Sequence, residues 1–325
     1  MRARLAGRFA LGLAILVLVL LAVDPAQVAD ALATADLRLV ALGILGLTAM
    51  HAVAAAGWRW MIAQRSGLRL SWGAALRVHY AAQALGSVTP GNLGSDLHRA
   101  SVVRQAGHGW PAAIEPIVVQ RATSYLALSL LAGIGLVVVS ATDELSRLIV
   151  LIGAGVAGLL LVVAWQLLRP MGPFRGLHAW LRRRVDGGAA DHGADEVTQA
   201  SWPVLLIGLG TGLVFHAGSV ALTWVLVAAV DPHTPVWPMV GAIAIARLSL
   251  AVPLTPNGLG VQEGTLATLL TAMQLPAQPA LAAMLLARLS TVLLAAIGVA
   301  LMVRGQGVSS PAAGYGEPGP TVERA

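Results

Sequence analysis

Long apolar runs separated by short charged segments dominate the hydrophobic pattern of this chain. An apolar run of about 20 residues is long enough to cross the hydrocarbon core of a bilayer as an α-helix. A soluble chain would instead alternate apolar and polar positions. The pattern predicts an all-α polytopic membrane protein with about six full spans. These are Phe9–Val23, Leu39–Ile62, Ile114–Val139, Leu148–Leu168, Val204–Val230 and Ala277–Val303.

Two further apolar segments are interrupted by proline and glycine. The segment Trp72–Trp110 stops at Pro90, and the segment Met239–Met273 breaks at Pro253 and Pro256. Backbone that is freed from helical hydrogen bonding is tolerated at membrane depth only where protein or a water-filled cavity satisfies it. We therefore predict two broken re-entrant segments, which in transporters are the best sequence pointer to the binding site.

The two breaks carry nearly the same sequence. Thr89–Gly94 reads TPGNLG, and Thr255–Gly260 reads TPNGLG 166 positions later. An acid follows each break and an arginine follows each acid by 25 residues: Asp96 and Arg121 in the first copy, Glu263 and Arg288 in the second. The shared interval indicates a duplication, and we predict an inverted repeat.

Arginines gather at the span ends that the predicted topology places in the cytoplasm. They stand before the first span, after the second and after the fourth: Arg2, Arg4, Arg8, Arg65, Arg69, Arg182, Arg183 and Arg184. Asp24–Arg38 is then an outer loop, and Arg304 ends the last span inside. The first broken segment enters from the cytoplasm and the second from outside, as an inverted repeat requires. We predict a multi-pass protein of the cytoplasmic (inner) cell membrane with both termini cytoplasmic.

One domain accounts for most of the chain. Residues 1–304 are predicted to form a helical transmembrane domain. Residues 305–325 are rich in Gly, Pro and Ser and are predicted to be a disordered cytoplasmic tail.

Composition supports the membrane class and excludes several functions. The chain is 57% apolar and 11% charged, with a mean hydropathy of +0.77. The sequence pI is near 11, but its arginines sit at span ends or inside spans, so no nucleic-acid partner is expected. The absence of cysteine excludes disulfides, thiolate metal sites and cysteine nucleophiles.

Four arginines lie inside otherwise apolar segments, where an ionisable group is costly and usually faces a cavity or a partner. They are Arg77, Arg121, Arg247 and Arg288. One interpretation is that they bind a phosphate, because a guanidinium presents a planar fork that matches phosphate oxygens. The other is that each neutralises an acid and locks helices together; Asp96, Glu115 and Glu263 are available. Because arginines outnumber these acids, positive charge remains for an anionic ligand.

The breaks have their own chemistry. Proline ends a helix, glycine permits a positive φ, and the next helix begins with free N–H groups that favour anions. The hinge residues are predicted to be Pro90, Gly91, Gly94, Pro253, Pro256, Gly258 and Gly260. Asp96 and Glu263 lie near the following helix starts, either as N-terminal caps or as contacts to a cation.

Motifs for other chemistries fail. Gly91–Gly94 lacks the lysine and spacing of a phosphate-binding loop. His51, His79, His98 and His108 have no ligand spacing and are assigned to polar packing. Ser87, Ser95 and Thr255 have no His and Asp companions in catalytic order. We expect no cofactor, no metal site and no enzymatic activity.

Two motifs resemble the flippase-like membrane domain of lysylphosphatidylglycerol synthases and of many stand-alone bacterial and archaeal proteins. The family pattern Pro-x-x-Gly-Gly-Asp-x-x-Arg is similar to Pro90–Arg99, with one extra residue and Ser95 in place of the second glycine. The pattern Pro-x-x-Pro-Gly-Gly-x-Gly-x-x-Glu is similar to Pro253–Glu263, with Asn257 in place of one glycine.

Arg121 and Arg288 also look like the span arginines of this family, and the resemblance covers roughly Arg59–Val303. It implies lipid translocation between leaflets. Nothing after Val303 is long enough to form the soluble aminoacyl-transferring domain that some members carry.

The leading hypothesis is therefore a non-enzymatic transporter of a phosphate-headed lipid: a phospholipid, an aminoacyl-phospholipid or a polyprenyl-phosphate lipid. The alternative is a non-catalytic accessory or scaffold subunit that partners a membrane enzyme of lipid or glycolipid assembly. The predicted substrate-binding residues are Arg77, Asp96, Arg99, Arg121, Arg247, Glu263 and Arg288.

Overall fold

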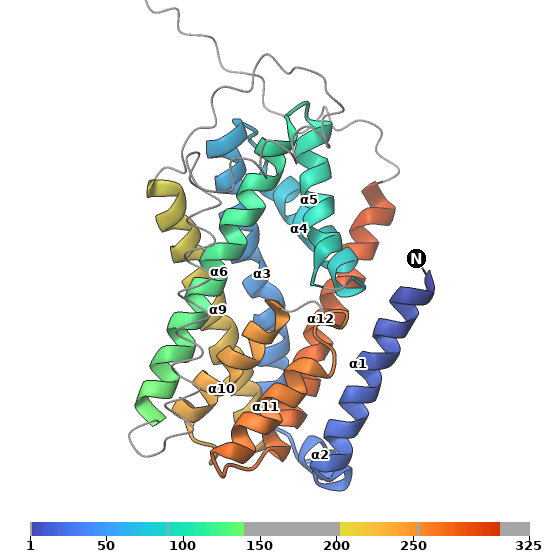
Figure 1. Cartoon of the computed structure of the whole chain (residues 1–325), viewed down its shortest axis with the longest axis vertical. Helices are drawn as coiled ribbons and strands as arrows, with labels where there is room; N and C mark the ends of the chain where they lie inside the picture. The colour runs from blue at the N-terminus through green and yellow to red at the C-terminus, as the bar shows by residue number, and fades with distance from the viewer. Residues whose placement is uncertain (1, 90, 140–201, 252–253, 306–325) are drawn as a thin grey trace, which may run out of the picture.

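A computed structural model describes residues 2–89, 91–139, 202–251 and 254–305 of the chain, and every regular element in these ranges is helical (Figure 1). The helices are α1 (Arg2–Ala22), α2 (Pro25–Ala33), α3 (Leu37–Ser66), α4 (Trp72–Ser87), α5 (Leu93–Gln105), α6 (Trp110–Val139), α9 (Trp202–Val230), α10 (Val236–Leu248), α11 (Val261–Ala272) and α12 (Gln278–Gly305). A 3-10 turn, η1 (Ser249–Ala251), extends α10.

Four of the described helices contain stretches long and apolar enough to cross a membrane. They are Leu37–Ser66, Ala112–Gly135, Val204–Val230 and Gln278–Val303. At a rise of about 1.5 Å per residue, each exceeds the hydrocarbon thickness of about 30 Å. These helices confirm four predicted spans within about four residues. The predicted span Leu148–Leu168 lies outside the described residues.

The first span differs from its prediction at its end. Phe9–Ala22 and Pro25–Ala33 together pass the same test, but they are bent by 88° at the break between them. The predicted outer loop Asp24–Arg38 thus contains a helix. The Asp24 carboxylate accepts a hydrogen bond from the backbone N–H of Ala26, and Pro25 suits the first helical position. Asp24 followed by Pro25 is a helix-start signal, and it argues against a loop at this position.

Both predicted breaks are present. The segment Trp72–Trp110 contains the helix pair α4 and α5, and the segment Met239–Met273 contains α10 and α11. The two pairs lie toward opposite ends of the molecule, with α4 and α5 above and α10 and α11 below (Figure 1). Pro90 and Pro253 lie outside the described residues, so the breaks are defined by the residues that follow them.

Contacts between helices correspond in the halves α3–α6 and α9–α12. Helix α3 packs on α9, and α4 packs on α12 as α10 packs on α6. Both of the latter crossings are close at a glycine. A Cβ atom at Gly135 of α6 would overlap the backbone of Gly241 in α10, and one at Gly298 of α12 would overlap the carbonyl oxygen of Tyr80 in α4. The first helix of each broken segment is thus held by the long helix of the other half.

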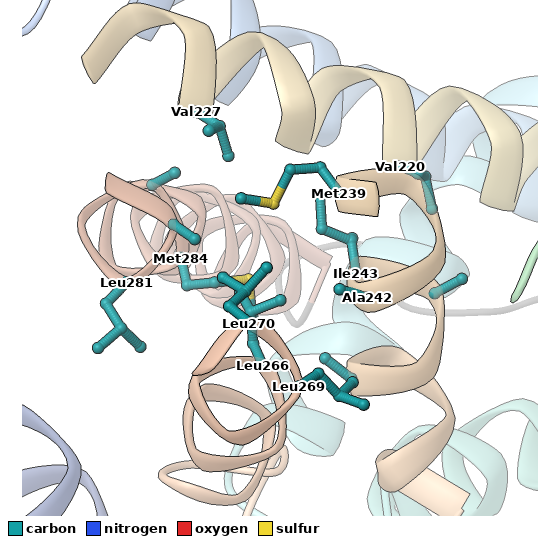
Figure 2. Packing of buried hydrophobic residues seen from close by; sticks show 14 of the residues in the cluster. Val220, Val227, Met239, Ala242, Ile243, Leu266, Leu269, Leu270, Leu281 and Met284 are labelled. Carbon is teal, nitrogen blue, oxygen red and sulfur yellow. The ribbon is translucent and has the colours of Figure 1, made fainter. Parts of the chain in front are cut away.

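The main packed core lies between α9, α10, α11 and α12. Met239 and Ile243 of α10, Leu266 and Leu270 of α11 and Leu281 of α12 are each at most 1% exposed (Figure 2). Residues 239 and 243, and 266 and 270, are spaced i, i+4, so each pair lies on one helix face. This core fixes the second broken segment between two long helices.

The outer surface of the long helices is apolar. Large hydrophobic side chains exposed by more than half include Leu13, Leu18, Leu21, Leu42, Leu45, Val292 and Val299. A soluble protein rarely exposes contiguous apolar surface of this extent, whereas lipid tails accept it. Together with the span lengths, this surface supports a multi-pass membrane protein.

The start of α1 and the end of α12 point toward the same end of the molecule (Figure 1). Helix α12 ends at Gly305, where the predicted tail begins. Residues 306–325 lie outside the described residues. Which membrane face this end occupies stays a prediction.

Candidate functional site

The two breaks adopt the same unusual backbone conformation. The two residues that follow the proline have positive φ in both, at Gly91 (59°) and Asn92 (60°) and at Asn257 (47°) and Gly258 (64°). Glycine adopts this region most readily, and asparagine does so more readily than most other residues. The order Gly-Asn in one copy and Asn-Gly in the other therefore serves the same turn, and the exchange leaves the break intact.

The first break closes on itself through Thr89. The backbone N–H of Gly94 donates to Thr89 Oγ1 at 2.8 Å, and that hydroxyl donates to the carbonyl oxygen of Leu85 at 3.1 Å. A Cβ atom at Gly94 would overlap the same carbonyl group. Gly94 is thus needed for close approach of α5 to α4 rather than for a special φ.

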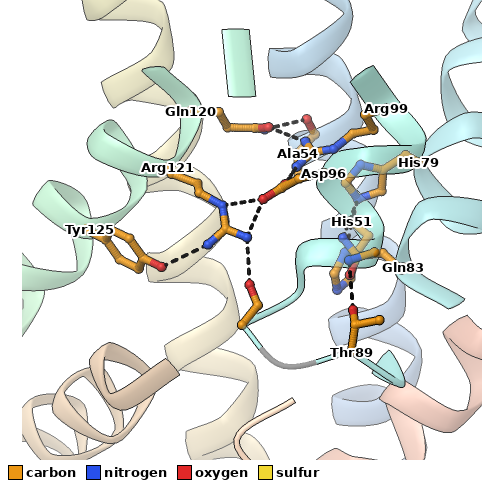
Figure 3. Close-up of polar contacts among 12 residues, drawn as sticks. His51, Ala54, His79, Gln83, Thr89, Asp96, Arg99, Gln120, Arg121 and Tyr125 are labelled. Carbon is orange, nitrogen blue, oxygen red and sulfur yellow. Dashed lines mark hydrogen bonds and ion pairs between the residues drawn. The ribbon is translucent and has the colours of Figure 1, made fainter. Parts of the chain in front are cut away.

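Asp96 binds two arginines at the start of α5 (Figure 3). Its Oδ1 accepts from Arg99 Nη2 at 2.7 Å, and its Oδ2 accepts from Arg121 Nε at 2.7 Å. Arg99 also donates to Gln120 Oε1, and the amide of Gln120 donates to the carbonyl oxygen of Ala54 in α3. Asp96 thus pairs with Arg121, which is one of the two interpretations of the span arginines, and Arg99 joins the pair.

Arg121 ties α6 to the break itself. Its Nη2 donates to the carbonyl oxygen of Gly91 at 2.8 Å, and its Nη1 donates to the Tyr125 hydroxyl at 3.3 Å (Figure 3). The guanidinium therefore satisfies a backbone carbonyl that the broken helix has freed, which a low-dielectric interior requires.

The second break repeats this arrangement. Arg288 Nε donates to Glu263 Oε1 at 2.8 Å, and its two Nη atoms donate to the carbonyl oxygens of Asn257 and Gly258 at 2.9 and 3.2 Å. In both copies the acid precedes its arginine by 25 residues. The residue whose carbonyl group accepts from that arginine, Gly91 or Gly258, precedes it by 30 residues. One interaction pattern thus holds both breaks.

The two acids differ in their second role. Glu263 Oε2 accepts from the backbone N–H of Gly260 at 2.9 Å, so of its two predicted roles, N-terminal cap or contact to a cation, the structure shows the cap of α11. Asp96 has no such bond among the described contacts: Asn92 occupies the N-cap position of α5 and makes no side-chain cap. Both carboxylate oxygens of Asp96 are already engaged by guanidinium groups, which bind more strongly than a backbone N–H.

A cavity of about 300 Å³, with charged and polar side chains in its wall, lies between the two breaks. Residues of both breaks line it, together with side chains from α3, α6, α9, α10 and α12. Its charged and titratable lining residues are His51, His79, Asp96, Arg99, Arg121, Tyr125, His216, Arg247 and Arg288. The tertiary structure thus brings the predicted residues Asp96, Arg99, Arg121, Arg247 and Arg288 to one site, and Glu263 lies directly behind Arg288.

Arg247 stands apart from the other three cavity arginines. Its Nη2 donates to Thr223 Oγ1 at 3.0 Å and to the carbonyl oxygen of Ser219 at 3.5 Å, both on α9. Among the described residues no carboxylate pairs with it. Glu115, one of the acids available to neutralise a span arginine, pairs instead with Arg65.

Arg77 is not brought to the cavity. Its side chain is exposed on α4, whereas His79 and Gln83 of the same helix line the cavity. Successive helical residues are rotated by about 100°, so position 77 points almost opposite to position 79. The apolar run around Arg77 predicted a membrane-embedded helix, but not the face of that helix on which Arg77 lies.

Three histidines in the cavity wall were not predicted as site residues. His51 Nδ1 lies 3.2 Å from His79 Nε2, and Phe215 packs edge-on against His51 and His216, with ring centroids 5.3 and 4.9 Å apart. Sequence spacing assigns His51 and His79 to polar packing, because it matches no metal-binding motif. A signal was present: His216 follows His51 by 165 positions, nearly the interval between the breaks.

The family described as Lysylphosphatidylglycerol synthase TM region matches this chain over residues 7–298. The match covers about nine-tenths of the sequence and includes both breaks, every cavity arginine and most of helix α1. Among curated proteins, none matches the chain.

Proposed function

The chain belongs to the lysylphosphatidylglycerol synthase TM region family, and from this membership and the geometry of the cavity we propose that it moves a phosphate-headed lipid between the two leaflets of the cytoplasmic membrane. The observation that carries the proposal is a cavity with charged and polar side chains in its wall, between helices whose outer faces are apolar. A cavity of this kind gives a lipid headgroup a polar path while the acyl chains remain in the bilayer.

The charge of the cavity supports an anionic headgroup. Four guanidinium groups line it, and the two nearby carboxylates, Asp96 and Glu263, leave two positive charges in excess. Charges inside a membrane protein are costly unless they are paired or serve a ligand. In this proposal the excess charge serves a phosphate, and Asp96 and Glu263 position the arginines that hold the breaks. Arg77 takes no part, because it faces away from the cavity.

We further propose that the two halves are an inverted repeat. The support is the matched pattern of acid, arginine and carbonyl at each break, together with the two broken segments pointing in from opposite ends (Figure 1). Inverted repeats place the binding site at their interface and allow it to open alternately to either side. The cavity lies at that interface, since residues of both breaks line it.

The activity proposed here is non-enzymatic. The second candidate is a non-catalytic membrane partner of a lipid-assembling enzyme. It is favoured because the family is the TM region of a lysylphosphatidylglycerol synthase. The two candidates differ in one measurable property: only a transporter changes the leaflet of a lipid when it is alone in a bilayer.

Reconstitution in vesicles that contain a headgroup-labelled fluorescent phosphatidylglycerol separates the candidates. Addition of a membrane-impermeant quencher destroys the outer-leaflet fluorescence at once, and transport then exposes the inner-leaflet label. We expect this slow phase to be faster than in protein-free vesicles. Equal rates with and without protein would exclude transport of this lipid and favour the accessory role.

A variant pair connects the rate to the cavity. Arg121→Gln should slow the exposure of the label several-fold, because it removes cavity charge while Asp96 keeps Arg99 as its partner. Arg69→Gln changes an exposed arginine outside the cavity and should behave like the wild type. Equal slowing by both would point to an effect of surface charge rather than of the cavity.

A further inference from the structure

Resting on the proposed function, we propose that the phosphate of the ligand binds at one point of the cavity, between the guanidinium of Arg247 and the imidazole of His216. The ligand chemistry is an ionised phosphate, whether carried by a lipid headgroup or free in solution. The other three cavity arginines pair with Asp96 or Glu263, and two of them also bind carbonyl groups of the breaks. They are not the primary phosphate ligands.

The arginines are distinguished by the bonds that they already make. Asp96 holds Arg99 and Arg121, and Glu263 holds Arg288, which also donates to two carbonyl groups of the break. Arg247 donates only to a hydroxyl and, at 3.5 Å, to a carbonyl oxygen. Within the described part of the chain its charge thus has no carboxylate counter-ion, and a bound anion would supply one.

His216 provides an independent observation at the same place. The residue is only 8% exposed and lines the cavity, yet neither of its ring nitrogens has a hydrogen-bond partner in the described structure. Buried polar groups are nearly always paired, and leaving one unpaired costs free energy. A neutral imidazole always carries one N–H, so His216 can donate one hydrogen bond to a phosphate oxygen.

Arg247 lies close to the histidines. It donates to Ser219 and Thr223 of α9, Ser219 lies about one helical turn from His216, and Phe215 joins His216 to His51 through edge-on ring contacts. A guanidinium among these rings repels a cation and attracts an anion. No three His, Asp or Glu side chains are grouped closely enough to hold a metal ion anywhere in the described ranges. The chemistry of the cluster therefore suits a phosphate.

The two halves differ in the residues that surround their corresponding histidines, His51 and His216. His51 of α3 faces a second imidazole, that of His79 of α4, at 3.2 Å. Its counterpart His216 of α9 lies about one helical turn from Ser219, to which the guanidinium of Arg247 of α10 donates. The breaks themselves are held by the same contacts in both halves. The difference between the halves thus places the anion site in the second half, beside α9 and α10.

Binding measured in detergent solution by isothermal titration calorimetry tests the site without requiring transport. The probes are dihexanoylphosphatidylglycerol, inorganic phosphate and dihexanoylglycerol, which lacks phosphate. We expect Arg247→Gln to weaken binding of the phospholipid by about tenfold to a hundredfold, the usual effect of losing a hydrogen bond to a charged group. Preferential binding of inorganic phosphate would identify free phosphate as the ligand, and binding of dihexanoylglycerol with equal affinity would overturn the proposal.

The variant His216→Phe distinguishes two roles of His216, binding of the ligand and packing. We expect it to weaken phospholipid binding by about tenfold and to leave the thermal unfolding midpoint equal or higher, because it removes two unpaired buried nitrogens. Wild-type affinity in this variant would overturn the role of His216. Arg69→Gln and His233→Phe, at exposed positions outside the cavity, should bind like the wild type.

The two proposals fail in different ways. In one case the wild-type protein moves lipid in vesicles, and Arg247→Gln and His216→Phe bind and move it equally well. This result would overturn the anion site and leave the transport proposal standing. Wild-type protein that binds the phospholipid through Arg247 and His216 but moves no lipid would support the anion site and overturn transport.

Discussion

The two carboxylates that hold the breaks are buried to different extents. The Glu263 side chain is fully buried, whereas the Asp96 side chain is 15% exposed and is shared by two arginines. Removing one partner of a buried ion pair leaves an uncompensated charge, which costs about 3–5 kcal/mol. The pair of Glu263 with Arg288 is therefore the one in which a single neutral substitution should have the larger effect.

This pair predicts an asymmetry between its two single variants. Arg288→Gln should lower the free energy of unfolding by about 3–5 kcal/mol, because it leaves the Glu263 carboxylate buried and unpaired. Glu263→Gln should cost only about 1–3 kcal/mol, because Arg288 keeps the carbonyl groups of Asn257 and Gly258 and its side chain is 19% exposed at the cavity. Thermal unfolding in detergent measures both, and equal losses would contradict the explanation.

The double variant tests whether the pair is more than structural. Glu263→Gln with Arg288→Gln should fold better than Arg288→Gln alone, because no buried charge remains. We expect it nonetheless to move lipid poorly in the vesicle assay, because Arg288 lines the cavity and supports the second break. A folded double variant with undiminished lipid movement would remove Glu263 and Arg288 from the site.

At the scale of elements, the broken helices depend on close helix crossings. Helix α10 approaches α6 so closely at Gly135 that any Cβ atom there would overlap the backbone of Gly241. Gly135→Ala should therefore separate the helices and cost at least about 1–3 kcal/mol, the usual effect of overpacking. Gly133 lies two residues earlier on the same helix, and a Cβ atom there would meet nothing within 4 Å, so Gly133→Ala is the matched control. Similar unfolding midpoints for the two variants would show that the crossing tolerates a methyl group.

At the scale of the whole molecule, the topology predicts which loops face the cytoplasm. The chain contains no cysteine, so a single engineered cysteine reports its own position. A cysteine at His233, in the exposed turn between α9 and α10, should react with an impermeant maleimide in intact cells. A cysteine at Gly73, exposed at the start of α4, should react only after lysis. The opposite result would invert the orientation, and with it the assignment of the first broken segment to the cytoplasmic side.

The sequence by itself determined the class of fold, the long helices and both breaks. These features depend on local physics: apolar runs of sufficient length become helices in lipid, and proline followed by residues that tolerate positive φ must interrupt them. The acid and arginine pairs were also predictable, because the interval of 25 residues occurs twice. Helix α2 was missed although its start signal, Asp24 with Pro25, is local and visible in the sequence.

Only the tertiary structure decided which of these residues share a cavity. Arg77 and Arg247 are alike in sequence, each an arginine in an apolar run, yet one is exposed on α4 and the other lines the cavity beside α9. His51, His79 and His216 come from three helices that meet only on folding. Helical periodicity relates residues within one helix, but the face that points inward depends on how the long helices pack against one another.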